Sequence, residues 1–303
     1  MKRLGKGTGK RAPQLRVEAS RRLRDAREAV PVWIMPIARA VEQFDPSSTR
    51  FDVVIVDEAS QCDILGLAVL YLGKSTIVVG DHEQVSPEGV GQELERITSL
   101  ISEYLSDIPN AALYDGRRSV YDIAREAFGG VIMLVEHFRC VPEIIQFSNS
   151  LCYNGRIRPL RESSNVALKP HVVPYRVREA YAEKKINKKE ALELASLLLA
   201  AVQHPAYKGK TFGVVSLVGE DQARLIDSFL RTYLSEREYK ERRILCGTAA
   251  QFQGDERDVM FLSLVDAPAG GPLPMREDDR FRQRFNVAAS RARDQMWVVY
   301  SLD

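Results

Sequence analysis

The chain has 303 residues, of which 45% are hydrophobic, and its formal net charge at pH 7 is +2. This length can bury about two domain cores, and no apolar run approaches the roughly 20 residues that a membrane-spanning helix needs. The N-terminus lacks the apolar stretch of a secretory signal and the four cysteines are widely spaced. We therefore expect a cytoplasmic protein with free thiols, without a membrane partner, a disulfide framework or a zinc site.

A basic segment opens the chain. Residues 1–30 contain ten Lys or Arg and three Asp or Glu, whereas the remainder contains 33 Lys or Arg against 38 Asp or Glu. Between Gln14 and Val30, apolar residues recur at steps of three and four and predict a helix whose other face carries arginines. This face either contacts nucleic-acid phosphates or is a solvated surface, and both interpretations stay open.

Short apolar strands alternate with helical stretches in the first half of the chain. Strands are predicted over 32–35, 51–56, 76–79 and 131–135, and helices over 64–72 and 119–128. Strands that are apolar on both faces are typical of a parallel sheet covered by helices on both sides.

The same alternation returns after residue 140. Strands are predicted over 212–218, 244–248, 259–265 and 296–300, and helices over 190–203 and 221–234. Residues 161–181 show no clear period and are expected to be irregular. The pattern predicts an α/β protein with two doubly wound parallel-sheet domains, residues 1–135 and residues 136–303.

Polar residues directly follow two of the predicted strands. Asp57 and Glu58 come after strand 51–56, and Asp81 and Gln84 come after the next strand. In parallel sheets, ligands bind beyond the carboxyl ends of the strands. A carboxylate pair there suits nucleotide hydrolysis, because one group holds magnesium while the other polarises the attacking water. Each strand end alone is also explained by an exposed turn.

The order of the motifs resembles the superfamily I DNA and RNA helicases, in the nonsense-decay-type branch with its bacterial AAA-domain members. The segments similar to motifs II to VI are DEASQ (57–61), GDHEQVSP (80–87), LVEHFR (134–139), TAAQFQGDERD (248–258) and NVAASRAR (286–293). The resemblance covers residues 51–303 and implies that both domains are RecA-like motor domains.

The resemblance also assigns roles to single residues. Asp57 is expected to bind magnesium, and Glu58 to act as the catalytic base. Gln84 is expected to contact the γ-phosphate, and Arg139 and Arg291 to reach that phosphate as arginine fingers. Taken singly, each of these arginines is better explained by a surface ion pair, and the company of the other motifs favours the finger role.

Further residues are expected around the two ligands. The nucleotide cleft is expected to include Asp81, Gly254 and Glu256, the last near the ribose. The nucleic-acid groove is expected to include Ser86, Pro87 and Thr248. The complete motor is expected to use ATP and Mg²⁺ and to bind single-stranded DNA or RNA.

One part of this machinery has no counterpart in the sequence. A motor of this type needs G-x-x-x-x-G-K-[ST], whose backbone amides and lysine hold the phosphates. The segment around Lys10 has Leu4 in place of the first glycine and Arg11 in place of Ser or Thr, and no strand precedes it. We interpret this segment as a basic tail. The first domain is therefore expected to be incomplete, and the chain alone is expected neither to bind ATP tightly nor to hydrolyse it.

Two classes of function stay open. One is a portion of an ATP-dependent helicase or translocase whose missing N-terminal half is supplied elsewhere. The other is a nucleic-acid-binding or scaffold module that retains the fold without hydrolysis. Strand 51–56 is expected to have an exposed edge, through which the chain self-associates unless the N-terminal segment caps it. The motor is favoured by the presence of Asp57, Glu58, Gln84, Arg139 and Arg291.

Overall fold

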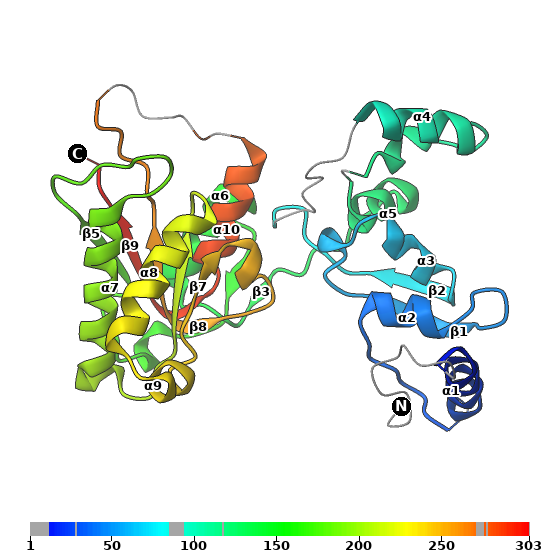
Figure 1. Cartoon of the computed structure of the whole chain (residues 1–303), viewed down its shortest axis with the longest axis horizontal. Helices are drawn as coiled ribbons and strands as arrows, with labels where there is room; N and C mark the ends of the chain where they lie inside the picture. The colour runs from blue at the N-terminus through cyan, green and yellow to red at the C-terminus, as the bar shows by residue number, and fades with distance from the viewer. Residues whose placement is uncertain are drawn as a thin grey trace. The chain divides into compact units, whose positions relative to one another are not determined.

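The computed structural model describes residues 12–27, 29–84, 94–116, 118–270, 276 and 278–302. The expected nucleic-acid residues Ser86 and Pro87 lie outside these ranges. The chain divides into two compact α/β units (Figure 1). The first comprises Met1–His82 with Ser86–Val131, and the second comprises Glu83–Val85 with Ile132–Asp303.

The first unit is built around a two-stranded parallel sheet. β1 (Phe51–Val56) pairs with β2 (Gly73–Val78) along their whole length. The helices of this unit are α1 (Ala12–Arg27), α2 (Ile37–Gln43), α3 (Leu67–Leu70), α4 (Leu94–Tyr104) and α5 (Val120–Phe128). Its small core includes Phe44, Val56, Leu72 and Val120.

The sheet of the first unit leaves apolar side chains uncovered by described residues. Val53 and Ile55 of β1 are 51% and 64% exposed, and Ile77 of β2 is 50% exposed. Among the described residues, each of these two strands pairs only with the other. Parallel strands are normally covered on both faces and joined into larger sheets, so this unit presents an apolar surface and an open edge in its described part.

Two of the predicted strands are wrong. Residues 32–35 and 131–135 form no strand, although their side chains are apolar and largely β-branched. Ile34 is 96% exposed and Ile132 is 92% exposed. Strand propensity reflects packing and pairing against neighbouring strands, and residues 32–35 and 131–134 have no place in the described sheets, whereas Val135 O accepts one hydrogen bond from Arg158 N of β4.

A five-stranded parallel sheet forms the centre of the second unit. Its strand order is β5–β9–β8–β6–β7. These strands are β5 (Val172–Arg176), β6 (Phe212–Ser216), β7 (Leu245–Thr248), β8 (Arg257–Ser263) and β9 (Ala292–Tyr300). A separate short parallel pair is formed by β3 (Glu136–His137) and β4 (Arg158–Pro159). β5 lies in the segment that was expected to be irregular, so this prediction is wrong for Val172–Arg176. Pro174 hides the strand pattern in the sequence, and proline is tolerated in β5 because this strand is at the edge of the sheet.

Helices cover both faces of this sheet. On one face, α7 (Lys188–Gln203) packs against α8 (Glu220–Tyr233), and on the other, α6 (Pro142–Cys152) packs against α10 (Asp279–Ala289) (Figure 1). The short helix α9 (Glu236–Glu241) precedes β7. The chain moves along the sheet in one direction through α8 and in the opposite direction through α10. Because crossovers between parallel strands are right-handed, these two helices must lie on opposite faces of the sheet. The doubly wound α/β fold is confirmed for this unit.

None of the helices in the described part combines the length and apolarity that crossing a bilayer requires. All four cysteines lie in that part, and none of them forms a disulfide bond. Three or more His, Cys, Asp or Glu side chains do not converge on a possible metal position anywhere in the described ranges.

Gly213 in β6 determines how closely this strand approaches its neighbours. A Cβ atom at this position would lie 2.8 Å from Phe252 Cε1 and 2.9 Å from Met260 Cε. Phe252 is fully buried and ends the 3₁₀ turn Ala250–Phe252 that follows β7. The packing of this turn against the sheet therefore depends on the missing side chain.

We expect Gly213→Ala to lower the free energy of unfolding by about 1–3 kcal/mol, because an added methyl group overpacks a filled core. Urea denaturation of the chain measures this change. Gly270→Ala is the matched control, since a Cβ there meets nothing within 4 Å, and it should change the stability by less than about 0.5 kcal/mol. Equal stabilities of the two variants would contradict the packing argument.

Candidate functional site

In the first unit, two carboxylates follow β1 at the carboxyl end of the sheet. Asp57 and Glu58 both have exposed side chains. Glu58 has a left-handed backbone with φ of 52°, and its N–H donates to Asp57 Oδ1 at 2.9 Å. Gln61 Nε2 donates to Glu58 Oε2 at 2.9 Å. A non-glycine residue in this conformation is sterically disfavoured, and such residues concentrate at functional sites.

The turn after β2 packs on the turn after β1. The N–H of Asp81 donates to Ser60 Oγ at 3.4 Å. A Cβ on Gly80 would lie 2.7 Å from Tyr121 Cδ2 and 3.0 Å from Ser60 N, so this approach requires glycine. The structure thereby brings Asp81 and the carboxylate pair to one edge of the sheet.

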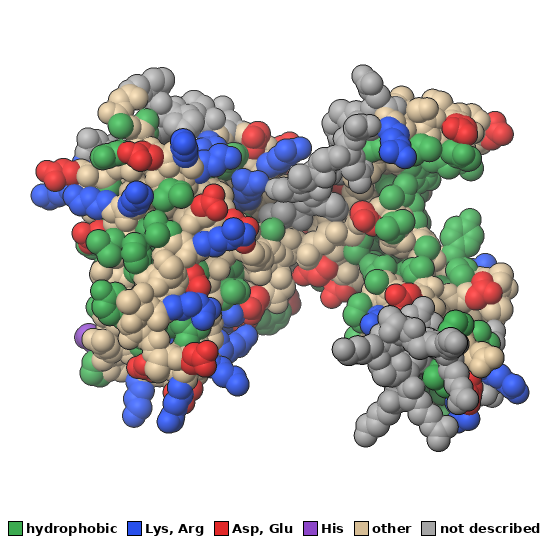
Figure 2. Space-filling model, in the orientation of Figure 1, with side chains coloured by type: hydrophobic (Ala, Val, Ile, Leu, Met, Phe, Trp, Pro, Cys, Tyr) green, Lys and Arg blue, Asp and Glu red, His purple; other side chains and the backbone are tan. Residues whose placement is uncertain are grey.

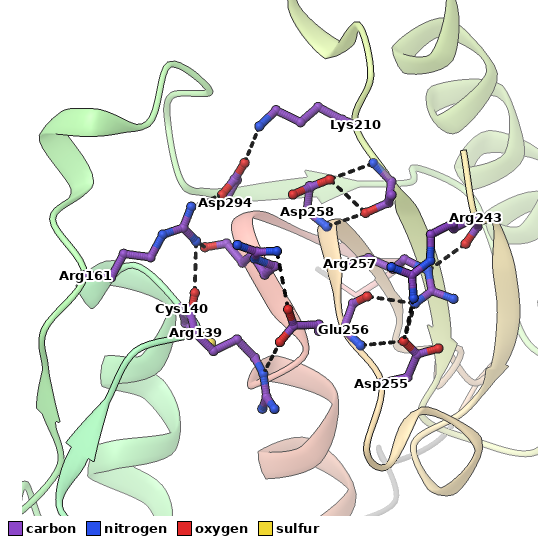
Figure 3. A network of polar contacts seen from close by, with 12 residues as sticks. Arg139, Cys140, Arg161, Lys210, Arg243, Asp255, Glu256, Arg257, Asp258 and Asp294 are labelled. Carbon is purple, nitrogen blue, oxygen red and sulfur yellow. Dashed lines mark hydrogen bonds and ion pairs between the residues drawn. The ribbon is translucent and has the colours of Figure 1, made fainter. Parts of the chain in front are cut away.

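In the second unit, Glu256 joins two arginines that are distant in the sequence. Arg139 Nε donates to Glu256 Oε2 at 2.7 Å (Figure 3). Arg293 Nη1 lies 3.4 Å from Glu256 Oε1. All three side chains are partly exposed, so the ion pairs add little stability. Their main consequence is that two guanidinium groups are held close together.

These side chains line a polar pocket of about 390 Å³. Its residues are Glu136, His137, Phe138, Arg139, Glu256 and Arg293. The ring of Phe138 is 68% exposed, and guanidinium groups bind phosphate oxygens in bidentate fashion. Two cations, a carboxylate and an accessible aromatic face together suit a nucleotide.

Sequence reasoning assigned no role to four residues of this pocket, among them Phe138 and Arg293. Phe138 directly precedes Arg139, and Arg293 follows Arg291 by two residues. An aromatic residue beside a candidate arginine finger was the available signal for the first. Arg293 gave no comparable signal, because its ion pair with Glu256 depends on the order of β8 and β9 in the sheet.

The turn before β8 directs Glu256 toward the arginines. Gly254 has a φ of 78°, which glycine adopts without steric strain. Asp255 Oδ1 accepts from Arg257 Nη1 at 2.6 Å and from the N–H of Glu256 at 2.9 Å (Figure 3). The hydrogen bond from Arg257 lowers the pKa of the Asp255 carboxyl. This turn therefore stays rigid and charged, and it fixes the backbone of Glu256.

Arg291 lies inside the second unit and does not line the pocket. Its side chain is buried, and Nη2 donates to Gln84 Oε1 at 3.3 Å. The neighbouring Glu83 accepts at its carbonyl oxygen from Asn286 Nδ2 at 2.8 Å. The structure thus brings together Gln84 and Arg291, two of the three residues expected to contact the same phosphate, and joins their segments a second time through α10.

The arginine cluster lies at the amino-terminal edge of the five-stranded sheet. Glu256 immediately precedes β8 and Arg291 immediately precedes β9. These residues therefore precede strands, unlike Asp57 and Glu58 of the first unit, which follow one. Thr248, which ends β7, does lie at the carboxyl edge. In this unit, the residues expected for nucleotide and for nucleic acid occupy opposite edges.

His137 is neutral beside the arginines. The N–H of Cys140 donates to His137 Nε2 at 2.9 Å, so this ring nitrogen carries no proton. Burial, together with the charges of Arg139 and Arg291, lowers the pKa of His137 to about 4 despite the opposing charge of Glu256. Burial likewise raises the pKa of the Cys140 thiol to about 12.

Comparison with known proteins places this chain among helicases. A family model described as an AAA domain matches residues 117–303. Helicase SEN1 of Saccharomyces cerevisiae is 26% identical over 273 residues, which cover 82% of this chain and 11% of that protein. The DNA replication ATP-dependent helicase/nuclease DNA2 of Gallus gallus is 25% identical over 257 residues, which cover 82% of this chain and 23% of that protein.

Two further similarities complete the comparison. An uncharacterized ATP-dependent helicase of Mycoplasma pneumoniae is 24% identical over 281 residues, which cover 88% of this chain and 24% of that protein. A solved structure of the PRRSV helicase aligns at 15% identity and a TM-score of 0.37, covering 82% of this chain and 34% of that one. The chain spans 11% to 24% of the length of these curated relatives.

The low pKa of His137 predicts a dependence of stability on pH. Its folded value of about 4 lies below the ordinary value of 6.5, so between these pH values the unfolded chain binds more protons. The contribution of His137 to stability is therefore lost as pH falls through this window. His137→Gln keeps an acceptor for the Cys140 amide but does not titrate.

We expect the free energy of unfolding to fall less steeply from pH 6.5 to pH 4 in His137→Gln than in the wild type. Urea denaturation at a series of pH values gives both slopes. His204→Gln, which replaces an exposed histidine, should follow the wild type. The assignment of a neutral His137 would be wrong if all three proteins had the same slope.

Proposed function

Because this chain belongs to the AAA-domain family of superfamily I helicases, in the branch that includes Sen1, we propose that it forms a portion of an ATP-dependent helicase or translocase motor. The cluster around Glu256 carries the proposal, because it unites residues of three family motifs at one pocket. The two compact units then correspond to the two RecA-like motor domains, for which the sequence predicts the ranges 1–135 and 136–303.

Hydrolysis requires a metal ion and an oriented water, and the carboxylates of the first unit fit both. Mg²⁺ is usually held by one or two carboxylates together with waters and substrate phosphates, and Asp57 offers an exposed carboxylate at a strand end. The bound ion would neutralise charge on the phosphates. Glu58 orients and deprotonates the attacking water. Asp81 is held near this pair, because its N–H donates to Ser60 Oγ.

The second unit supplies cations for the charge that develops on the transferred phosphate. Arg139 is partly exposed at the pocket and is oriented by Glu256. Arg291 is hydrogen-bonded to Gln84, so a phosphate that contacts one of these side chains lies close to the other. We assign Gln84 and Arg291 a joint role at the γ-phosphate, and Gly254 and Glu256 a place at the nucleotide cleft.

The phosphate loop of this motor lies outside residues 1–303 in our proposal. The sequence contains no G-x-x-x-x-G-K-[ST], and without its amides the β- and γ-phosphates lose their main anchors. The polypeptide that provides the loop also covers the exposed apolar surface of the first sheet around Val53, Ile55 and Ile77. Residues 1–303 alone therefore do not hydrolyse ATP. When residues 1–303 are separated from that polypeptide, the same uncovered surface promotes self-association.

Two substitutions in the longer protein that carries the phosphate loop separate binding from chemistry. Glu58→Gln should abolish hydrolysis and preserve ATP binding, because positioning of the phosphates is unchanged. Arg291→Ala should raise the barrier to hydrolysis by about 3 kcal/mol or more, the loss of roughly 10³-fold or more in kcat that removal of an arginine finger causes. Steady-state ATPase assays with single-stranded DNA and RNA measure both effects.

Arg237→Ala is the control for these assays, because Arg237 forms an exposed ion pair with Glu241 on α9. It should retain wild-type turnover. Robust ATPase activity of residues 1–303 alone that disappears in Lys10→Ala would overturn the proposal. That result would show that the basic tail is a working phosphate site.

A further inference from the structure

A tight turn with two lysines at its tip joins β5 to α7. Glu183 N donates to Ile186 O at 2.8 Å and Ile186 N donates to Glu183 O at 2.9 Å. The tip residues Lys184 and Lys185 have φ values of 47° and 69°. Two-residue turns with positive φ at both positions favour asparagine and glycine. A lysine in the left-handed conformation costs about 1 kcal/mol or more at each position.

The lysines of this turn are available to a ligand. Lys184, Lys185 and the nearby Lys188 are exposed and form no ion pair with any described residue. Basic side chains gather at the edge of the second unit where Figure 1 draws the segment between β5 and α7 (Figure 2). Four lysines within six residues, 184–189, give this segment a concentrated positive charge.

Glu183, which begins the turn, is exposed and forms no ion pair with a described residue, whereas other acidic side chains near the turn have cationic partners. Glu179 lies 3.7 Å from Lys189. Glu220, at the start of α8, lies 2.9 Å from Arg224, which also approaches Asp221 at 4.0 Å. These pairs reduce the local negative charge that would otherwise neutralise the lysine turn.

A buried polar network holds the turn against the sheet. The N–H of Asn187, which directly follows the turn, donates to Gln222 Oε1 at 2.9 Å, and Asn187 Nδ2 donates to Ser301 Oγ at 3.0 Å. Glu190 accepts from Ser263 Oγ at 2.7 Å and from Ser301 Oγ at 2.6 Å. Ser263 ends β8 and Ser301 follows β9. The lysines are therefore mounted on the rigid carboxyl edge of the sheet.

Contacts connect this turn to Thr248 along the same edge. A Cβ on Gly219 would lie 3.8 Å from the Cβ of Lys185. The next residue, Glu220, accepts from Gln251 Nε2 at 3.4 Å, and Gln251 Oε1 accepts from the N–H of Thr248 at 2.8 Å. The lysine turn is thus close to the position at which the sequence predicts the nucleic-acid groove.

We propose that Lys184 and Lys185 bind the phosphodiester backbone of single-stranded nucleic acid and extend the groove from Thr248 across the carboxyl edge of the second unit. This inference rests on the proposed function, because it assumes that the chain binds nucleic acid. Lysine ammonium groups bind phosphates as point charges and do not read base sequence. Asn-Gly at the tip would make this turn more stable, but the sequence has two lysines there. We therefore assign the function of the turn to the charge at its tip.

The test removes both charges without harming the turn. Lys184→Asn combined with Lys185→Gly installs the pair that this turn geometry favours, so its unfolding midpoint should equal or exceed that of the wild type. The matched control is Lys208→Gln combined with Lys240→Gln, which removes two exposed lysines at the amino-terminal edge of the same sheet. Lys184→Arg combined with Lys185→Arg retains both charges.

The measurement is the fluorescence anisotropy of a labelled oligothymidylate of about 20 nucleotides, titrated with residues 1–303 between about 50 and 200 mM salt. The Asn-Gly variant should bind several-fold more weakly. The magnitude of its slope of log affinity against log salt should fall by about 1.4, since each lost contact to a single strand accounts for about 0.7. The lysine control and the arginine variant should match the wild type.

Each other outcome overturns the inference. If the Asn-Gly variant binds with the wild-type affinity and slope, the lysine turn is not part of the groove, while the proposed function stands. A loss that is equal in the lysine control would show only a general effect of net charge. Absence of binding by the wild-type chain would overturn both the lysine site and the proposal that these residues bind nucleic acid.

Discussion

The carboxylate of Glu256 is the contact on which the arrangement of the pocket in the second unit depends. Arg139 comes from the segment that follows β3, Arg293 from β9, and Glu256 from the turn before β8. In a pocket without this carboxylate, the two guanidinium groups would repel each other. With it, they stay within reach of one anionic ligand, although partly exposed ion pairs contribute little to the stability of the fold. The interaction therefore serves positioning more than stability.

The parallel sheet gives this contact its place. Every strand of the five-stranded sheet runs in the same direction, so residues that precede these strands gather at one edge and residues that follow them gather at the other. Glu256 and Arg291 precede strands, whereas Thr248 ends one and the lysine turn is anchored to the ends of β8 and β9. In the proposed motor, nucleotide and nucleic acid thus meet opposite edges of one rigid sheet.

Local features of the sequence were predictable, and contacts between distant segments were not. The apolar runs of β1, β6 and β8 and the carboxylates after β1 follow from patterns of a few residues. β5 was missed because Pro174 obscures its pattern, and residues 131–135 were wrongly predicted as a strand because propensity does not supply a pairing partner. The hydrogen bond from Arg291 to Gln84 joins residues that are 207 positions apart in the sequence. The lysine turn was not predicted, because its two lysines have a left-handed backbone that lysine rarely adopts.

A double-mutant cycle for ATP turnover tests most directly whether Glu256 acts by positioning Arg139. The wild type, Arg139→Ala, Glu256→Ala and the double variant would be compared in the protein that carries the phosphate loop. The account predicts strong coupling, of about 0.5–3 kcal/mol, with the double variant turning over no more slowly than Arg139→Ala alone. Independent effects that add within about 0.5 kcal/mol would contradict it.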